Sequence, residues 1–190
     1  TYDANFRLTE FLTQSYDAGL SIWVNQERHT SSYDAQGNFT ADEYFSYNLG
    51  LSQWNLNYGS LYANTYNAQN QLLSRTAQEY DGAMATYVND YREINYLYNA
   101  FGNPSSWDEE EWDGAQWVPT IKYLYTYDGN GFPISAEIQE WDALTSTFVP
   151  AYKYDEVVWY NWTGDLEDGL VAYTLNLSYN PATSMWDTAG

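Results

Sequence analysis

Carboxylates and aromatic rings are the residues of this sequence that could do chemistry. Runs of acids stand at Asp108-Glu109-Glu110-Glu111 and Asp165-Leu166-Glu167-Asp168, in a chain with nine tryptophans. A pair of carboxylates beside aromatic rings is what hydrolysis of a glycosidic bond requires. A catalytic pair would be a singular feature, however, whereas Glu79, Glu111 and Glu140 recur at equivalent places, each just before an aromatic residue. We therefore expect no enzymatic activity.

His29 is the only histidine, and the chain has no cysteine. Histidine-based activation of a nucleophile and multi-histidine metal sites both need partners that this composition lacks, so we interpret His29 as an ordinary strand residue. Calcium binds several oxygen ligands that converge within a loop. Asp128-Gly129-Asn130-Gly131 and the surroundings of Asp165 and Asp168 offer such oxygens, but neither matches a complete calcium loop. We expect no cofactor, with calcium as the open alternative.

Aromatic rings give the strongest binding hypothesis. Sugar rings stack on the faces of tryptophan and tyrosine while neighbouring Asp and Asn side chains form hydrogen bonds. The candidate glycan-binding residues are Trp107, Trp112, Trp117 and Trp141. The alternative is that these rings pack on one another as cross-strand pairs and form the core of the sheet. We favour the core interpretation, and the glycan site stays open.

Composition and charge restrict the partners. The chain has 190 residues, of which 26 are acidic and 6 basic, and its net charge is −20. Such a charge repels nucleic acid and anionic membrane surfaces. In addition, no apolar stretch approaches the roughly 18 residues of a membrane span. We therefore expect neither a nucleic-acid partner nor membrane insertion, and sugars, proteins and cations remain as partner classes.

A tandem repeat dominates the sequence. A turn phrase that begins with Tyr-Asp or Tyr-Asn has its tyrosines at positions 2, 33, 66, 98 and 127, at intervals of 31, 33, 32 and 29 residues. Midway through each unit stands a second phrase, an aromatic residue followed by Asp or Asn, as in Trp112-Asp113-Gly114-Ala115; in the last unit we place it at Trp186-Asp187. The six repeats start near Tyr2, Tyr33, Tyr66, Tyr98, Tyr127 and Tyr160.

Both phrases predict turns between strands. Asp or Asn at the first position of a turn caps backbone amides, and Gly, or Asn70, accepts the left-handed conformation that closes it. Segments between the turns alternate with period two, as in Lys122-Tyr123-Leu124-Tyr125-Thr126-Tyr127, where three tyrosines share a face. We predict an all-β fold, a single domain over residues 1–190, formed by an antiparallel meander of about eleven strands from six tandem two-stranded repeats. Whether the sheet stays open, closes into a barrel or folds into a sandwich is left open.

Four of the six basic residues occupy one repeated position, five residues after a midway aromatic residue. They are Arg28, Arg92, Lys122 and Lys153. If each Tyr-Asp turn has a four-residue loop, Tyr33 pairs with Asn38, and this register places the cations opposite carboxylates. Each such ion pair contributes at most about 1 kcal/mol, so its role is to define register. The predicted pairs are Arg28 with Glu43, Arg92 with Glu109, and Lys122 with Glu137.

The phrases Tyr-Asp-Ala-x-Gly-Asn and Trp-Asp-Gly-x-x-Trp-Val, with a following Tyr-x-Tyr, resemble the tyrosine-rich tandem repeats of proteins exported by the type IX system of Bacteroidota. More distantly they are similar to the YD repeats of Rhs-type proteins. The resemblance covers nearly the whole chain and implies a strand array at the cell surface or outside the cell. Asp187-Thr188-Ala189 also matches the O-glycosylation pattern of that phylum, which makes Thr188 a candidate modification site, with a plain turn as the alternative.

Two functions are consistent with this organisation. In the first, the chain is an extracellular structural protein that self-assembles as a fibre subunit. Its first residues look like the end of a strand and its last like the approach to another, which would leave open sheet edges for copies of itself. In the second, the sheet presents an aromatic face to glycans, as an adhesin-type module does.

Overall fold

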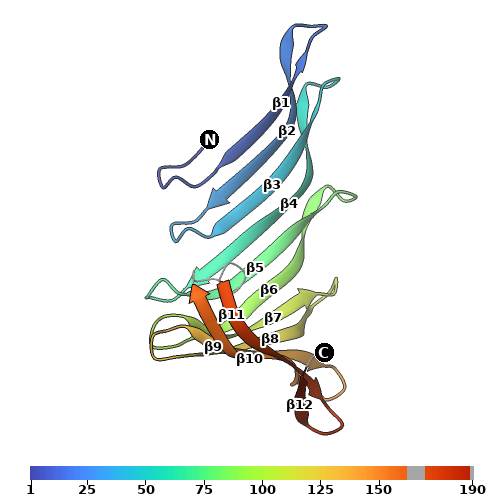
Figure 1. Cartoon of the computed structure of the whole chain (residues 1–190). Coiled ribbons are helices and arrows are strands. Elements are labelled where there is room, and N and C mark those ends of the chain that lie inside the picture. The colour runs from blue at the N-terminus through green and yellow to red at the C-terminus, as the bar shows by residue number, and fades with distance from the viewer. Residues whose placement is uncertain (162–169, 189–190) are drawn as a thin grey trace. The chain divides into compact units, whose positions relative to one another are not determined.

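The computed structural model of the chain describes residues 1–161 and 170–188. All regular structure in these residues is β-strand, and the strands follow one another in sequence order as an antiparallel meander (Figure 1). The predicted fold class is confirmed, with twelve strands in place of about eleven. The strands are β1 Glu10–Asp17, β2 Ile22–Tyr33, β3 Phe39–Asn48, β4 Gln53–Tyr66, β5 Leu72–Asp81, β6 Thr86–Tyr98, β7 Pro104–Trp112, β8 Trp117–Tyr127, β9 Pro133–Asp142, β10 Thr147–Asn161, β11 Leu170–Asn180 and β12 Met185–Thr188.

The chain divides into two compact units, Thr1–Arg92 and Glu93–Gly190, with the boundary inside β6. Within each unit, the extensive contacts join each strand to its neighbours in the sequence. The predicted turn that starts at Tyr160 continues into residues 162–169, which lie outside the described part of the chain. The single domain over residues 1–190 and the count of six repeats therefore stay predictions.

The turns at the Tyr-Asp phrases share one hydrogen-bond pattern. After Tyr33, the amide of Asp34 donates to the carbonyl of Asn38 over 2.9 Å, and the Asp34 carboxylate accepts from the amides of Gln36 and Asn38 at 3.0 and 2.9 Å. Gly37 closes the turn in the left-handed conformation, with a φ of 95°. The same bonds recur in the turns whose first residues are Asp3, Asn67, Asn99 and Asp128. Their left-handed residues are Phe6, Asn70, Gly102 and Gly131.

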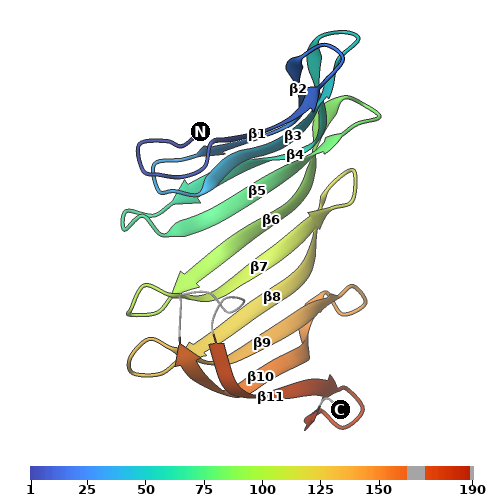
Figure 2. The same ribbon diagram turned by 45° about the horizontal axis from the view of Figure 1, so that its top comes forward.

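The midway phrases form hairpins at the opposite edge of each unit (Figure 2). In the hairpin between β5 and β6, the Asp81 carboxylate accepts from the amides of Ala83 and Met84 at 2.8 and 3.1 Å. One residue of each hairpin is left-handed: Ser21, Ser52, Ala85, Gly114, Ser146 and Ser184. The last hairpin begins at Asn180, whose side chain accepts from the amide of Ala182. Our placement of the last midway phrase at Trp186-Asp187 is therefore wrong, because both residues belong to β12, after the turn.

The predicted register is wrong by two positions because the Tyr-Asp turn is longer than we assumed. Tyr33 pairs with Phe39 and not with Asn38, and an irregularity follows, since Ser32 pairs with Ala41. As a result Arg28 lies opposite Phe45, and Lys122 lies opposite Gln139. The predicted cross-strand partners Glu43 and Glu137 instead lie opposite Thr30 and Leu124. The third predicted pair, Arg92 with Glu109, stays a prediction.

Bulges recur near the start of the strands that follow the midway hairpins. In each case one residue is skipped in the pairing with the preceding strand, which bends the bulged strand locally. The skipped residues are Gln26 in β2, Asn57 in β4, Thr120 in β8 and Ala151 in β10. Because one residue is skipped, the alternation of side chains between the two faces is interrupted at the bulge. The bulge therefore helps to decide which side chains share a face.

Alternation along the strands divides the side chains of each unit between two faces. We name as the stack face of the first unit the side that carries Phe11, His29, Tyr44 and Tyr58, and as its pair face the side that carries Tyr16, Trp23, Arg28, Phe45, Tyr47 and Trp54. In the second unit the stack face carries Trp107, Tyr123, Tyr125 and Tyr127, and the pair face carries Asp108, Trp112, Trp117, Lys122, Trp141 and Phe148. The three tyrosines predicted to share a face in β8 do so.

Very few apolar side chains of the described residues are buried. The buried ones are Val24, Ala77, Ala136 and Val157, together with Pro133. Large apolar side chains such as Trp23, at 65% exposure, and Phe11, at 59%, stay in contact with solvent. The aromatic rings therefore pack sideways, on rings of neighbouring strands, and leave much apolar surface free for other molecules.

Candidate functional site

Aromatic pairs stand at the base of the midway hairpins, where the two residues lie directly opposite each other. Their ring centroids are 5.0–5.5 Å apart and their planes cross at 62–70°, which is the edge-to-face arrangement that aromatic rings prefer. The first unit has Tyr16–Trp23, Tyr47–Trp54 and Tyr80–Tyr87; the second has Trp112–Trp117, Trp141–Phe148 and Tyr179–Trp186. In such a pair one ring covers a single face of the other, so the remaining ring faces are left uncovered by the partner.

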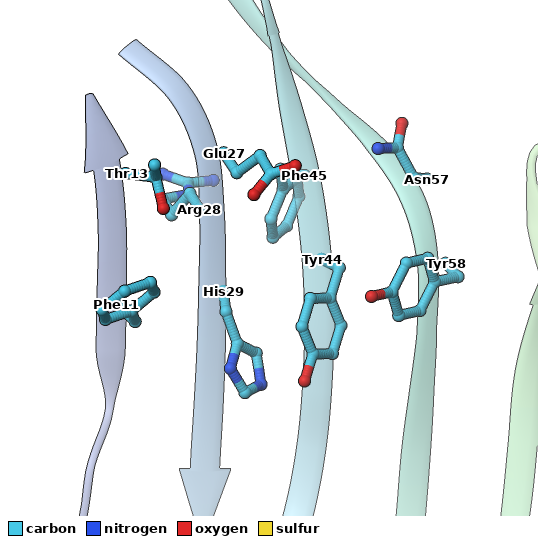
Figure 3. Close-up of a pocket in the computed structure, with 9 residues that line it drawn as sticks. All are labelled: Phe11, Thr13, Glu27, Arg28, His29, Tyr44, Phe45, Asn57 and Tyr58. Carbon is cyan, nitrogen blue, oxygen red and sulfur yellow. The ribbon is translucent and has the colours of Figure 1, made fainter. Parts of the chain in front are cut away.

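Rings on the stack face of the first unit are arranged differently. His29 lies parallel to Tyr44, with centroids 3.9 Å apart, and Tyr44 lies 4.4 Å from Tyr58. Figure 3 shows these rings in a row with Phe11 across β1 to β4. The row borders a shallow hollow of about 230 Å³, whose polar lining includes Thr13, Glu27 and Asn57. Both faces of Tyr44 are covered by its neighbours, so the row offers mainly ring edges to a ligand.

Trp107 lies in a similar stack on the second unit. Its ring is nearly parallel to those of Tyr96, at 5.6 Å, Tyr123, at 4.7 Å, and Tyr125, at 5.2 Å. Tyr96 belongs to β6 and the other two tyrosines to β8, and these strands flank β7. Both faces of the Trp107 ring are therefore occupied by tyrosines.

The four predicted glycan-binding tryptophans thus fall into two groups. Trp112 and Trp117 form one edge-to-face pair, and Trp141 forms another with Phe148, all on the pair face of the second unit. Trp107 lies on the opposite face, in the stack. Sequence reasoning missed the equivalent pairs of the first unit, above all Trp23, although its place in the repeat was the available signal.

Amide side chains stand next to two of the pairs on the first unit. Two residues inward from Tyr16–Trp23, the Nε2 of Gln14 donates to the Oδ1 of Asn25 over 2.8 Å. Two residues inward from the Tyr80–Tyr87 pair, Gln78 and Asn89 form the same bond over 3.0 Å. These two hairpins therefore carry an aromatic pair followed by an amide pair, whereas Phe45 and Leu56 stand at the equivalent place next to Tyr47–Trp54.

Cations of the predicted column contact the rings of the next hairpin. The Arg28 guanidinium lies over Phe45, at 4.4 Å, and over Trp54, at 5.0 Å, while Lys122 Nζ lies 5.2 Å from the ring of Phe148. The position of Trp54 relative to Arg28 is the same as that of Phe148 relative to Lys122, 26 residues further on. Arg28 and Lys122 thus stabilise the pair face by cation–π contacts. The carboxylates that we predicted as their partners, Glu43 and Glu137, do not lie opposite them.

Lys122 also pairs with a buried carboxylate. Asp108 is 9% exposed; its Oδ1 lies 2.9 Å from Lys122 Nζ, and its Oδ2 accepts from Asn95 Nδ2 over 2.7 Å. Asp108 belongs to the acidic run Asp108-Glu109-Glu110-Glu111, and strand alternation places its consecutive members on opposite faces. The run therefore forms no compact carboxylate cluster.

His29 takes part in a hydrogen-bonded group that sequence reasoning did not foresee. Its Nε2 lies 2.6 Å from Asp42 Oδ1, and Ser31 Oγ donates to the same oxygen over 2.7 Å. A nucleophilic serine would instead donate to the histidine, whose other nitrogen would bind the acid. Ser31 Oγ also lies 3.3 Å from His29 Nε2, so the same nitrogen faces both the serine and the acid, which is not the arrangement of a triad. The hydrogen bonds of this group stabilise the stack face.

The other predicted sites have simple surroundings. Within residues 1–161 and 170–188, no group of three or more His, Cys, Asp or Glu side chains is placed to hold a metal ion. The Asp128 carboxylate accepts from the amides of Asn130 and Phe132, so it caps its turn. Asp165 and Asp168 lie outside the described residues. Thr188 ends β12 opposite Leu177 and is exposed.

Across the described ranges, no helix has the length and apolarity to cross a membrane.

Tyrosines of the Tyr-Asp turns bind the neighbouring turn on the same edge. Tyr33 Oη donates to the Leu8 carbonyl at 3.0 Å, and Tyr127 Oη donates to the Pro104 carbonyl at 2.6 Å. Burial raises the pKa of Tyr127 to about 12. The turns of each unit are thereby connected along the edge, which holds the repeating registers in place.

No protein-family model matches the sequence, and no curated protein matches it. Among solved structures, a protein of unknown function from Bacteroides fragilis NCTC 9343 is similar, with a TM-score of 0.50, 15% identity, and coverage of 67% of this chain and 90% of that one. A DUF3836 family protein from Parabacteroides distasonis ATCC 8503 matches at a TM-score of 0.41, with 22% identity over 47% of this chain and 80% of its own. Another DUF3836 family protein, from Bacteroides vulgatus ATCC 8482, matches at a TM-score of 0.40, with 18% identity over 48% of this chain and 90% of its own. The first likeness concerns the fold alone.

Proposed function

We propose that the protein is an extracellular structural protein of the cell surface that assembles with copies of itself by pairing strands at the open edge of β1. One observation carries the proposal: among the described strands, β1 pairs with β2 only, and it exposes apolar side chains on both faces. Phe11, Leu12 and Tyr16 are exposed by 59%, 43% and 54%. An exposed apolar edge strand is a template for pairing with another chain.

Edge strands that avoid pairing carry lysine, proline or a bulge. The sequence of β1, EFLTQSYD, contains neither lysine nor proline. The bulge of the first hairpin lies in β2, at Gln26, so the outer side of β1 stays regular. Charged residues stand only at the two ends of this strand, Glu10 and Asp17, so residues 11–16 carry none of these protective features.

Backbone groups on the outer side of β1 are oriented for an incoming strand. The amide of Glu10 donates to the Thr1 carbonyl at 3.3 Å, and its carbonyl accepts from the Thr1 ammonium at 2.5 Å. Because the N–H and C=O of a residue in an antiparallel strand point to the same side, those of Leu12, Gln14 and Tyr16 point outward as well. A strand of a second copy that pairs with β1 would find alternating donors and acceptors there.

Location outside the cell is the part of the proposal that rests on the sequence. The chain has no cysteine and a net charge of −20, and this charge keeps an aromatic-rich surface in solution until copies meet at high local concentration. A location at the cell surface or outside the cell is also what the resemblance to tyrosine-rich surface repeats implies.

The test replaces one outward amide. Leu12→Pro removes a donor from the open side and leaves the β1–β2 hydrogen bonds, whereas Leu12→Thr removes the same apolar side chain and keeps the amide. We expect the original chain to form larger species as its concentration rises in light scattering and electron microscopy, the threonine variant to do the same, and the proline variant to stay monomeric. An original chain that is monomeric at every concentration, or a proline variant that assembles equally well, would overturn the proposal.

A further inference from the structure

We infer that the first unit binds a neutral lipid surface through the tips of its three midway hairpins, where Leu20, Leu51 and Met84 enter the surface. These tips are turns and are separate from the open side of β1, so the inference does not depend on the proposed assembly. Four features of the described residues carry it: the equivalent places of the three side chains, their exposure, the aromatic pairs behind them and the charge around them.

The three side chains occupy the same position of three equivalent turns. Each is the third residue after the residue that caps the turn, and its amide donates to the side chain of that residue, at 3.0 Å for Leu20 and at 3.1 Å for both Leu51 and Met84. The residue that follows is left-handed in every case. Because the backbone repeats in this way, the three side chains project alike from the turns of β1–β2, β3–β4 and β5–β6, which share one edge of the unit (Figure 1).

The turn itself does not require an aliphatic residue at this position. The hairpins β9–β10 and β11–β12 of the second unit also have four residues between their strands and a left-handed residue at the same place, but they carry Thr145 and Thr183 at the equivalent position. The first unit has three large apolar side chains there, exposed by 61–66%. Burial within the fold does not explain them, and exposed apolar groups that gather at one edge indicate contact with another molecule.

The tips recede in steps along the edge. Counted from the Glu27–Ser46 pair, the first hairpin extends by four further pairs and the second by two. Counted from the Ser60–Glu79 pair, the second hairpin extends by six and the third by two. The line of tips therefore runs obliquely to the strands. Because three points define a plane, one flat surface touches all three tips when the strands meet it at a slant, and a fluid surface adapts to small differences in height.

An aromatic pair stands directly behind each tip. Rings of tryptophan and tyrosine are enriched at the headgroup level of bilayers, because they combine an apolar body with a polar edge. When the aliphatic side chains reach the acyl boundary, these pairs lie within the depth of about 5–10 Å that interfacial elements occupy. A place among the headgroups does not require an open ring face, so the Arg28 guanidinium over Trp54 does not oppose it. The pairs are Tyr16–Trp23, Tyr47–Trp54 and Tyr80–Tyr87.

Backbone amides of the tips already have partners. The Asp17 carboxylate accepts from the amides of Gly19 and Leu20, and the Asp81 carboxylate accepts from those of the equivalent two residues. Backbone groups without partners are costly in hydrocarbon, so this capping lowers the cost of moving the tips out of water. The expected absence of membrane insertion concerned anionic surfaces and spanning stretches, and three turns on a neutral surface are neither.

Charge restricts the lipid to one with a neutral headgroup. Asp17 and Asp81 are held at the tips by their bonds to the turn amides, and the whole chain carries a net charge of −20. An anionic lipid surface repels these groups. A phosphatidylcholine headgroup instead has its ammonium group outermost, where it lies next to the carboxylates. A second copy would bring its own carboxylates to the same places, so charge favours the lipid as the occupant of this edge.

The experiment measures flotation of the chain with vesicles of phosphatidylcholine, at a concentration at which light scattering shows monomers. The triple variant Leu20→Thr, Leu51→Thr, Met84→Thr introduces the residue that the second unit has at this position, and its partition coefficient should fall at least about tenfold. Phe6→Asn is the matched control, because Phe6 is 88% exposed in a turn of the opposite edge, and it should bind as the original chain does. Vesicles of phosphatidylcholine and phosphatidylserine in equal parts should bind less, and circular dichroism shows that each variant is folded.

Four results would overturn the inference. They are an original chain that does not float with phosphatidylcholine, a folded triple variant that floats equally well, an equal loss in Phe6→Asn, and stronger binding to the vesicles that contain phosphatidylserine. If the original chain does not float and the triple variant no longer assembles, the tips contact a second copy instead. The assembly at the edge of β1 is tested separately by Leu12→Pro and Leu12→Thr in the absence of vesicles, so either proposal can fail without the other.

Discussion

The hydroxyl of Tyr66 donates a hydrogen bond to the carboxylate of Asp34, which joins the tyrosine of one Tyr-Asp turn to the first turn residue of the preceding one. Asn38 Nδ2 donates to the same hydroxyl at 2.6 Å, and Asn64 Nδ2 donates to Asp34 Oδ2 at 3.1 Å. Tyr33 and Tyr127 make equivalent contacts to backbone carbonyls. A phenolic oxygen is thus needed at this place of the repeat, which explains why tyrosine and not phenylalanine begins the phrase.

Tyr66→Phe should destabilise the chain by about 1–3 kcal/mol, because it removes the half-buried hydroxyl that donates to Asp34 and accepts from Asn38. The measurement is urea denaturation followed by circular dichroism. Tyr58→Phe is the control, since the Tyr58 side chain is 55% exposed and no bond of its hydroxyl depends on the turn. Equal stability losses in the two variants would mean that the bond between the turns contributes nothing.

Stability should fall at alkaline pH through the same tyrosines. Burial, together with the hydrogen bond to Asp34, raises the pKa of Tyr66 to about 12, and burial raises the pKa of Tyr127 to about 12, whereas an unperturbed tyrosine titrates near about 10. A raised pKa favours the neutral form in the folded chain, so this stability is complete below about pH 10 and is lost as the pH rises from about 10 to 12. Tyr66→Phe should show a smaller loss over that window; an unchanged slope would contradict the assignment.

Stability should also fall at acidic pH, through turn carboxylates whose pKa is lowered in the folded chain. Hydrogen bonds from the amides of Phe132 and Asn130 lower the pKa of Asp128, and at Asp34 the bonds from Tyr66 and Asn38 outweigh burial and lower the pKa. Carboxylates with a lowered pKa contribute stability above their ordinary value near about 4, and this stability is lost as the pH falls through the folded value. Asp128→Asn keeps a turn-capping side chain and should flatten the acid limb of the stability profile. If the stability of Asp128→Asn falls with acid as steeply as that of the original chain, the Asp128 turn contributes nothing to the acid dependence.

Turn positions and the strand class were predictable from the sequence because they depend on local chemistry. Asp34 and Gly37 specify a capped turn with a left-handed residue wherever they occur at this spacing. The register was not predictable in the same way. A one-residue difference in the loop, combined with the irregularity after Ser32, displaces every partner of Arg28. The signal was present, since Gly in the fourth place after Tyr33 is typical of a type I turn followed by a bulge.

The candidate site was predictable in part for a related reason. Trp112, Trp117 and Trp141 stand beside hairpins that the turn phrases locate, so their place at one edge follows from the repeat, and all three are half-buried there. Trp107 stands in mid-strand, and its stack with Tyr96 and Tyr123 depends on which rings two neighbouring strands bring opposite one another. That is a property of register and bulges, and composition says nothing of it.

Phe6 is a site where backbone strain can be removed. Its φ is 63°, in the left-handed region that disfavours bulky residues, while its side chain is 88% exposed. Phe6→Gly should stabilise the chain by up to about 1 kcal/mol, because glycine adopts this conformation without strain. Phe6→Ala removes the same ring and keeps most of the strain, so its stability should stay near that of the original. A higher melting temperature in the alanine variant alone would show that the ring, and not the backbone, is costly.

Lys122 and Asp108 provide a test of a buried carboxylate on the pair face of the second unit. Lys122→Met keeps an apolar contact to Phe148 and leaves Asp108 with Asn95 as its remaining partner, so the chain should lose about 2 kcal/mol or more. Asp108→Asn removes the charge that needs the cation, and combining it with Lys122→Met should recover most of that loss. Urea denaturation of the original chain, both single variants and the double variant gives the coupling energy directly. Additive losses would mean that Asp108 does not depend on Lys122, and that the cation acts through the ring of Phe148 alone.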